Sequence, residues 1–118
     1  MRKQANPLKR MQALGRLKAG KMNQTEAAYS RKLELMKAAG EILWFSFEGL
    51  KFRLADNTFY TPDFPVMRAD GVIEIHEVKG MWTDDARVKI KMAAELFPFR
   101  FVAVKKARGG QWSSEYFD

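Results

Sequence analysis

Three charged residues near the middle of the chain have types and spacing that could carry out chemistry: Asp63, Glu77 and Lys79. Between them, Asp70-Gly71 is a strong hairpin signal, so the strands before and after it should run antiparallel. This pairing places Asp63 at the end of the sheet where Glu77 lies. Two carboxylates held close together either share a proton or bind a cation, and Lys79 adds a third charge beside them.

The strand VIEIHEVKG, residues 72–80, carries further charged side chains, and alternation sorts them. Glu77 and Lys79 share one face of the strand, while Glu74 and His76 share the other. We therefore expect His76 to pack against its neighbours or lie at the surface, and Glu74 to be solvated. The alternative for Glu77 and Lys79 is a structural ion pair on an edge strand, where charges discourage aggregation.

The first elements that must position these residues follow from capping and composition. Asn23 can cap a helix while Glu26, three residues later, completes a capping box. The helix should end near Ala39, with Gly40 as its C′ residue. Residues 41–54, EILWFSFEGLKFRL, have the aromatic and β-branched content of strands, with Gly49 as a break or bulge. Together with the hairpin they predict three antiparallel strands in a meander.

The second half of the chain predicts one more helix and one more strand. Thr83 can cap a helix that ends before Pro98, and a buried strand follows over residues 99–104. The tail over residues 105–118 is polar and contains glycine, with its aromatic residues as anchors. The element order α, β, β, β, α, β predicts an α/β fold in which a central mixed sheet is flanked by helices.

With this element order, Pro62-Asp63 and, fourteen residues on, Glu77-Val78-Lys79 resemble the PD-(D/E)xK signature of the restriction-endonuclease-like nuclease superfamily. The resemblance covers residues 23–104. The sequence motif TPDF…HEVKG is similar to that of small phage-encoded members, including Holliday junction resolvases. It implies an αβββαβ core and a metal-dependent endonuclease that hydrolyses phosphodiester bonds in DNA. Branched or junction DNA in phage recombination or replication would be its substrate.

The resemblance also implies roles for the three charged residues. Asp63 and Glu77, with the backbone carbonyl of Val78, would hold Mg²⁺, for which Mn²⁺ would substitute. Lys79 would orient or stabilise the attacking hydroxide.

A third carboxylate has two candidates. The junction-resolving nucleases place a further glutamate on the first helix, and Glu26 matches that position. Glu26 could bind a second metal or position a water, or it could serve only as the capping-box residue. Glu48 is the rival candidate for the third carboxylate.

The chain carries a net charge of +7 at pH 7, and the excess lies at its N-terminus. Of the 21 basic residues, seven lie in residues 1–24 without any acid, which leaves 14 basic against 14 acidic residues in the rest. We predict a basic, flexible arm over residues 1–22 that contacts DNA phosphates, and a single nuclease domain over residues 23–118. The arm's candidate DNA contacts are Arg2, Lys3, Lys9, Arg10, Arg16, Lys18 and Lys21. The alternative is a solubilising tail.

The second helix offers two more candidate DNA contacts, Arg87 and Lys91, which lie four residues apart on a polar stripe. Two apolar arcs flank this stripe, and one of them must cover the sheet. The other is a candidate homodimer surface, or it lies beneath the tail. The arcs consist of Ala86, Ile90, Ala93 and Phe97, and of Val88, Met92 and Leu96.

Composition narrows the class of protein. The chain has no cysteine, which excludes disulfides, thiolate metal sites and a cysteine nucleophile and favours a reducing compartment. It also lacks an apolar run long enough to span a membrane, so we expect a soluble cytoplasmic protein. The alternative function is a non-catalytic nucleic-acid-binding accessory protein that keeps the fold, although such a protein has no need for all three charged residues. A third reading is a subunit of a larger recombination or packaging complex.

Overall fold

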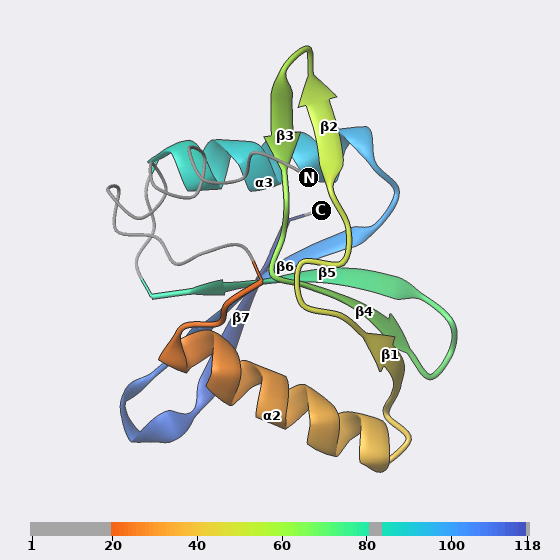
Figure 1. The fold of residues 1–118 in the computed structure, drawn as a ribbon, viewed down its shortest axis with the longest axis vertical. Coiled ribbons are helices and arrows are strands. Elements are labelled where there is room, and N and C mark those ends of the chain that lie inside the picture. The colour runs from red at the N-terminus through yellow and green to blue at the C-terminus, as the bar shows by residue number, and fades with distance from the viewer. Residues whose placement is uncertain (1–19, 81–83, 118) are drawn as a thin grey trace, which may run out of the picture.

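The structure is a computed structural model that describes residues 20–80 and 84–117. Within these residues, a five-stranded mixed sheet lies between two helices, and a two-stranded hairpin projects beside the second helix (Figure 1). The predicted α/β fold with a mixed sheet flanked by helices is confirmed at this level. Most of the predicted arm, residues 1–19, and the predicted cap Thr83 lie outside the described residues.

The elements occur along the chain in an order close to that expected. They are α2 (Gln24–Ala38), β1 (Ile42–Phe45), β2 (Phe52–Ala55), β3 (Thr58–Tyr60), β4 (Phe64–Arg68), β5 (Ile73–Lys79), α3 (Asp84–Leu96), β6 (Arg100–Lys106), a 3₁₀ turn (Arg108–Gly110) and β7 (Trp112–Phe117). No helix in the described ranges is long and apolar enough to cross a membrane.

Helix α2 begins with the predicted capping box. The Asn23 side chain accepts a hydrogen bond from the backbone N–H of Glu26 at 2.8 Å, and the Glu26 carboxylate accepts one from the N–H of Asn23 at 2.9 Å. The helix ends before Gly40, whose φ of 80° is a left-handed conformation that glycine adopts without steric cost. Tyr29 and Leu33 are buried on the face that packs against the sheet.

The large sheet has the strand order β1-β4-β5-β6-β7. Strands β5 and β6 are parallel and the other neighbours are antiparallel, so the sheet is mixed. The hairpin between β4 and β5 turns at Asp70-Gly71 as predicted, with Gly71 at a φ of 86°. Because β5 lies in the middle of the sheet, the idea that Glu77 and Lys79 protect an exposed edge strand is wrong.

Residues 41–54, expected to form strand structure with a break or bulge at Gly49, contribute to two separate sheets. Strand β1 pairs with β4 in the large sheet, whereas β2 pairs with β3 in the projecting hairpin. The chain changes direction at Glu48, whose φ is 54°, and at Gly49, where a Cβ would lie 2.7 Å from the Ser46 hydroxyl oxygen. The predicted meander is therefore interrupted by an inserted hairpin.

The C-terminal tail also differs from the expectation, because it forms an edge strand. Strand β7 pairs antiparallel with β6, with Phe101 opposite Phe117 and Lys106 opposite Trp112. Phe117 is buried and Trp112 is partly buried, so two of the expected aromatic anchors do anchor the tail. The polar residues between them gave no strand pattern in the sequence, because an edge strand needs few apolar side chains.

Each face of the sheet carries its own hydrophobic core. Helix α2 packs on one face with Phe64, Val66 and Val102, and α3 packs on the other with Ile75, Phe101 and the inner face of the β2–β3 hairpin. The α3 residues Ile90 and Ala93 are fully buried there, so the first predicted arc covers the sheet. The second arc, formed by Val88, Met92 and Leu96, is exposed.

Candidate active site

Asp63 and Glu77 lie side by side where β4 begins and β5 approaches its end. The backbone N–H of Asp63 donates to Oε1 of Glu77 at 3.2 Å, and the N–H of Val78 donates to Oδ2 of Asp63 at 2.8 Å. Asp63 is only 7% exposed. The hairpin therefore brings together the two carboxylates that the sequence pointed to, and we call them the carboxylate pair.

Two further groups contact the Glu77 carboxylate. The hydroxyl of Tyr60, from β3, donates to Oε1 at 2.8 Å, and Nζ of Lys79 lies 3.2 Å from Oε2. Both Glu77 and Lys79 are mostly buried, with side chains 12% and 17% exposed. Groups from β3, from the residue before β4 and from β5 itself thus fix the orientation of this carboxylate. Lys79 shares its face of β5, as alternation predicted.

The surroundings raise the pKa of both acids. Burial raises the pKa of Asp63 to about 9, with contributions from the charges of Glu77 and Glu26, while the Val78 N–H and Lys79 oppose the shift. Burial also raises the pKa of Glu77, against the opposing effects of Lys79 and Tyr60. Two acids so arranged hold a proton at neutral pH unless a cation takes its place.

The backbone carbonyl of Val78 lies on the side of β5 that faces Asp63. In an extended strand the N–H and C=O of one residue point to the same side, so the Val78 carbonyl lies on the edge of β5 whose N–H contacts Asp63. Extending the register of Phe64 opposite His76 by two residues places Pro62 opposite Val78. Proline has no N–H to donate to that carbonyl.

These oxygens fit a hard divalent cation. Within residues 20–80 and 84–117, no three side chains of histidine, cysteine or acid type are grouped so that they alone could hold a metal. The chain therefore offers two carboxylates and one carbonyl, and water or phosphate oxygens would complete the shell. Magnesium is usually bound in this way, because it keeps several waters and takes one or two carboxylates.

The two candidates for a third carboxylate have different surroundings. Glu26 stays in its capping box, yet its charge contributes to the raised pKa of Asp63, so the start of α2 lies near the carboxylate pair. The Glu48 carboxylate instead accepts a hydrogen bond from the N–H of Gly20 at 2.9 Å. Its backbone N–H donates to the Asp63 carbonyl at 2.7 Å, so Glu48 positions Asp63 through the main chain.

On the opposite face of β5, His76 is buried in a chain of hydrogen bonds. Its Nε2 lies 2.9 Å from the Glu74 carboxylate, and its Nδ1 lies 2.6 Å from the hydroxyl oxygen of Tyr29. The packing role expected for His76 is confirmed. The solvated position expected for Glu74 is wrong, because α2 covers that face and Glu74 also contacts Arg68 at 3.3 Å. The hydrogen bond from His76 is the main cause that lowers the pKa of Glu74.

Strand β6 adds residues that the sequence did not single out. In register, Lys79 lies beside Lys105 and then Ser113, so an exposed lysine extends the row that begins at the candidate site. Two residues before Lys79, Glu77 lies beside Ala103 of β6, which in turn lies beside Glu115 of β7. Lys105 could have been found from the sequence only by pairing the two strands that end in lysine in parallel. No sequence pattern pointed to Tyr60 as a hydrogen-bond donor to Glu77.

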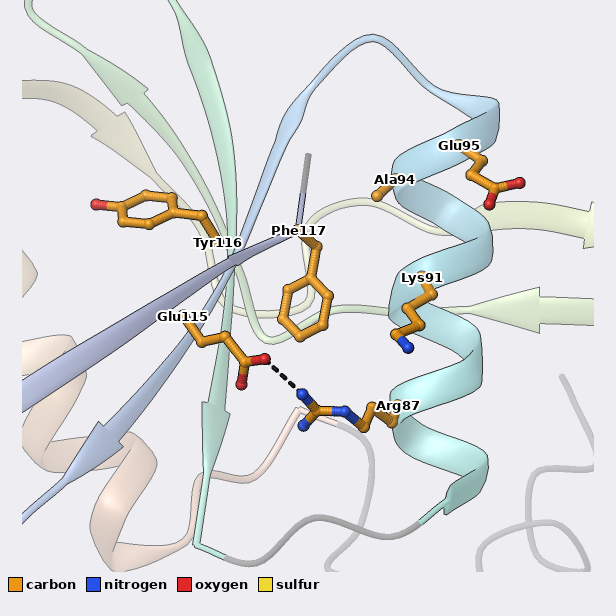
Figure 2. A pocket seen from close by; sticks show the side chains of 7 residues that line it. All are labelled: Arg87, Lys91, Ala94, Glu95, Glu115, Tyr116 and Phe117. Carbon is orange, nitrogen blue, oxygen red and sulfur yellow. Dashed lines mark hydrogen bonds and ion pairs between the residues drawn. The ribbon is translucent and has the colours of Figure 1, made fainter.

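The two candidate DNA contacts on α3 point toward β7. Arg87 forms an ion pair with Glu115 at 2.5 Å and lies over the ring of Phe117, and Lys91 lines the pocket between α3 and β7 (Figure 2). A phosphate would have to compete with Glu115 for Arg87. Of the candidate contacts in the arm, Lys21 lies exposed just before α2, and the others lie outside the described residues.

Fold and site together define a mixed α/β protein with a buried carboxylate pair and an adjoining lysine. The chain belongs to the DUF1064 family, described as a protein of unknown function, whose match spans residues 20–113. That span contains the carboxylate pair, Lys79, and both candidates for a third carboxylate. No curated protein and no solved structure was found to match the chain.

Proposed function

We propose that the protein is a Mg²⁺-dependent DNA endonuclease of the PD-(D/E)xK type that acts on branched or junction DNA. The observation that carries the proposal is the contact of Asp63 with Glu77, at 3.2 Å, beside Lys79, at 3.2 Å from Glu77. Burying two acids together costs folding free energy, so a purely structural role would favour apolar residues there. A protein that only binds nucleic acid has no use for this arrangement.

The residues of the chain take defined roles in this proposal. Asp63, Glu77 and the Val78 carbonyl hold Mg²⁺, with Mn²⁺ able to substitute. Such an ion, when bound, lowers the pKa of a water and offsets charge on the phosphate. Lys79 positions the attacking water and stabilises the negative charge that the phosphate gains. The Tyr60 hydroxyl holds Glu77 in its orientation, and burial raises the Tyr60 pKa, so the hydroxyl stays a donor.

The reaction is hydrolysis of a phosphodiester. The oxygen of water forms a bond to phosphorus, the bond from phosphorus to one of the two ester oxygens breaks, and that oxygen takes up a proton. One DNA end keeps a phosphate monoester and the other gains a hydroxyl.

Charge supports DNA as the partner. The basic excess in residues 1–24 suits contacts with phosphates, and Lys105 extends the cationic row beside Lys79. The exposed arc of Val88, Met92 and Leu96 would suit a homodimer that cuts two symmetric strands, with a cytoplasmic setting in an infected bacterium.

The test compares cleavage of linear duplex, single-stranded, nicked and four-way-junction DNA in Mg²⁺ and in EDTA. Asp63→Ala and Lys79→Ala should abolish cleavage, whereas Glu34→Gln, which changes an exposed acid on α2, should leave it intact. Absence of metal-dependent cleavage of every substrate would overturn the function. Cleavage that survives Asp63→Ala would overturn the site.

A further inference from the structure

The outward face of the β2–β3 hairpin combines one aromatic ring with two cations, and a third cation reaches the hairpin backbone from α3. We call this group the hairpin patch. Phe59 is 41% exposed and lies opposite Arg53 in the hairpin register. Nζ of Lys51 is 4.6 Å from the centre of the Phe59 ring, and Nζ of Lys89, from α3, donates to the Phe59 carbonyl at 3.2 Å. None of these four residues takes part in the candidate active site.

The core does not require this arrangement. The inner face of the hairpin already supplies Phe52, Leu54 and Tyr60 to the hydrophobic core, whereas Phe59 points away from it. Asp56 is the only acid in residues 51–60, and it pairs with Arg53. The patch therefore keeps an excess of positive charge around a ring that is open to solvent.

Single-stranded nucleic acid matches this chemistry. Proteins bind unpaired strands by stacking bases on aromatic rings while basic side chains contact the backbone phosphates. The Lys51 ammonium over the ring shows that its face can be approached, and a base could take that place while the flexible lysine moves to a phosphate. An acidic peptide would use the cations but would leave the ring without a planar partner.

The hairpin patch is also close to the candidate active site along the chain. Phe59 precedes Tyr60, whose hydroxyl holds Glu77, and Asp63 follows four residues after Phe59. Four extended residues span at most about 14 Å. At the rise of about 3.4 Å per nucleotide in duplex DNA, this corresponds to at most about four nucleotides, and to fewer in a more extended unpaired strand.

We propose that the hairpin patch binds an unpaired DNA segment within a few nucleotides of the cut site, with one base stacked on Phe59. This inference rests on the proposed function for its reference to a cut site. It narrows the substrate class to DNA in which a single-stranded segment adjoins a duplex, such as a flap or a splayed junction.

The test is fluorescence anisotropy with labelled single strands of about 12 nucleotides, and with duplex of the same length, in EDTA. Phe59→Ala should weaken single-strand binding about five- to a hundredfold and duplex binding much less, and Phe59→Trp should restore it. Tyr116→Ala is the matched control, because Tyr116, on β7, is also an exposed aromatic residue with a cationic side chain, that of Arg100, over its ring. Circular dichroism and thermal unfolding confirm that each variant is folded.

Unchanged single-strand binding in Phe59→Ala, or equal losses for single strand and duplex, would overturn the inference. Because EDTA prevents metal-dependent cleavage, the binding result does not depend on catalysis. An active nuclease with an unaffected Phe59→Ala variant would refute the patch and leave the function standing. Patch-dependent binding without cleavage of any substrate would refute the function and leave the patch standing.

Discussion

Asp63 and Glu77 are held by hydrogen bonds from each other's strand: the Asp63 N–H donates to Glu77, and the N–H of Val78, next to Glu77, donates to Asp63. Backbone groups therefore fix both carboxylates, and side-chain rotation alone cannot separate them without losing a hydrogen bond. Such positioning is what a metal site requires, and it leaves two acids close together in a buried place.

Removing one of these charges should stabilise the metal-free protein. The folded-state pKa of Asp63, about 9, lies above the ordinary value near 4, so this acid costs stability increasingly as pH rises from about 4 to about 9. Asp63→Asn keeps an acceptor for the Val78 N–H and should raise stability at pH 8 by about 1 to 3 kcal/mol, and by little at pH 4. Thermal unfolding in EDTA at both pH values measures this.

Glu34→Gln, which alters an exposed acid on α2, controls for a general charge effect and should show no such gain. An Asp63→Asn protein that is less stable than the wild type at pH 8 would contradict the raised pKa.

Loss of the Tyr60 hydroxyl should weaken metal binding more than folding. Tyr60→Phe keeps the buried ring but removes a donor that lowers the pKa of Glu77, so Glu77 should hold its proton more tightly. We expect cleavage to fall about tenfold at limiting Mg²⁺ and to recover in part at high Mg²⁺. Rates measured across a Mg²⁺ titration test this, with Tyr116→Phe as control. Equal losses at every Mg²⁺ concentration would argue for a role outside metal binding.

Substitution of the neighbouring lysines Lys79 and Lys105 should affect different steps, the first the cleavage rate and the second DNA binding. Lys79→Ala should reduce the cleavage rate about a hundredfold or more with little effect on DNA affinity, because in the proposed mechanism this lysine acts at the reacting phosphate. Lys105→Ala should weaken DNA binding a few-fold and reduce the salt slope of binding by about 0.9, as expected for one lost phosphate contact. Lys37→Ala, an exposed lysine at the end of α2, is the control. A Lys105→Ala variant with an unchanged salt slope would remove Lys105 from the interface.

The basic N-terminus should supply most of the salt-dependent affinity. If about four of its cations contact phosphates, binding falls roughly a hundredfold between 50 and 200 mM salt. Deletion of residues 1–19 keeps the bond from Gly20 to Glu48, so it tests the arm without disturbing the site. Binding isotherms at several salt concentrations should give a flatter slope for the truncated protein, and an identical slope would exclude the arm from DNA contact.

Local signals in the sequence were sufficient for several parts of the fold. The capping box of Asn23 with Glu26 and the turn at Asp70-Gly71 depend on residues a few positions apart, and both formed as predicted. Strand alternation then sorted Glu77 from His76 correctly, because the two-residue period does not depend on what packs against the strand.

Features that depend on distant partners were not predictable. Glu74 is shielded from solvent because α2 covers its face of the sheet. Residues 112–117 form a strand because the edge of β6 is open for pairing. The inserted β2–β3 hairpin likewise follows from the left-handed turn at Glu48, a residue type that rarely adopts it. The donor from Tyr60 to Glu77 could be found only once this hairpin was placed.

The most direct test of the proposed chemistry is cleavage of four-way-junction DNA with Mg²⁺ by the wild type and by Asp63→Ala, each repeated in EDTA. The wild type should cut only with the metal, and Asp63→Ala should cut in neither condition while still binding the junction. Wild-type protein that binds the junction but never cuts any DNA with Mg²⁺ or Mn²⁺ would contradict the assignment of the carboxylate pair to catalysis.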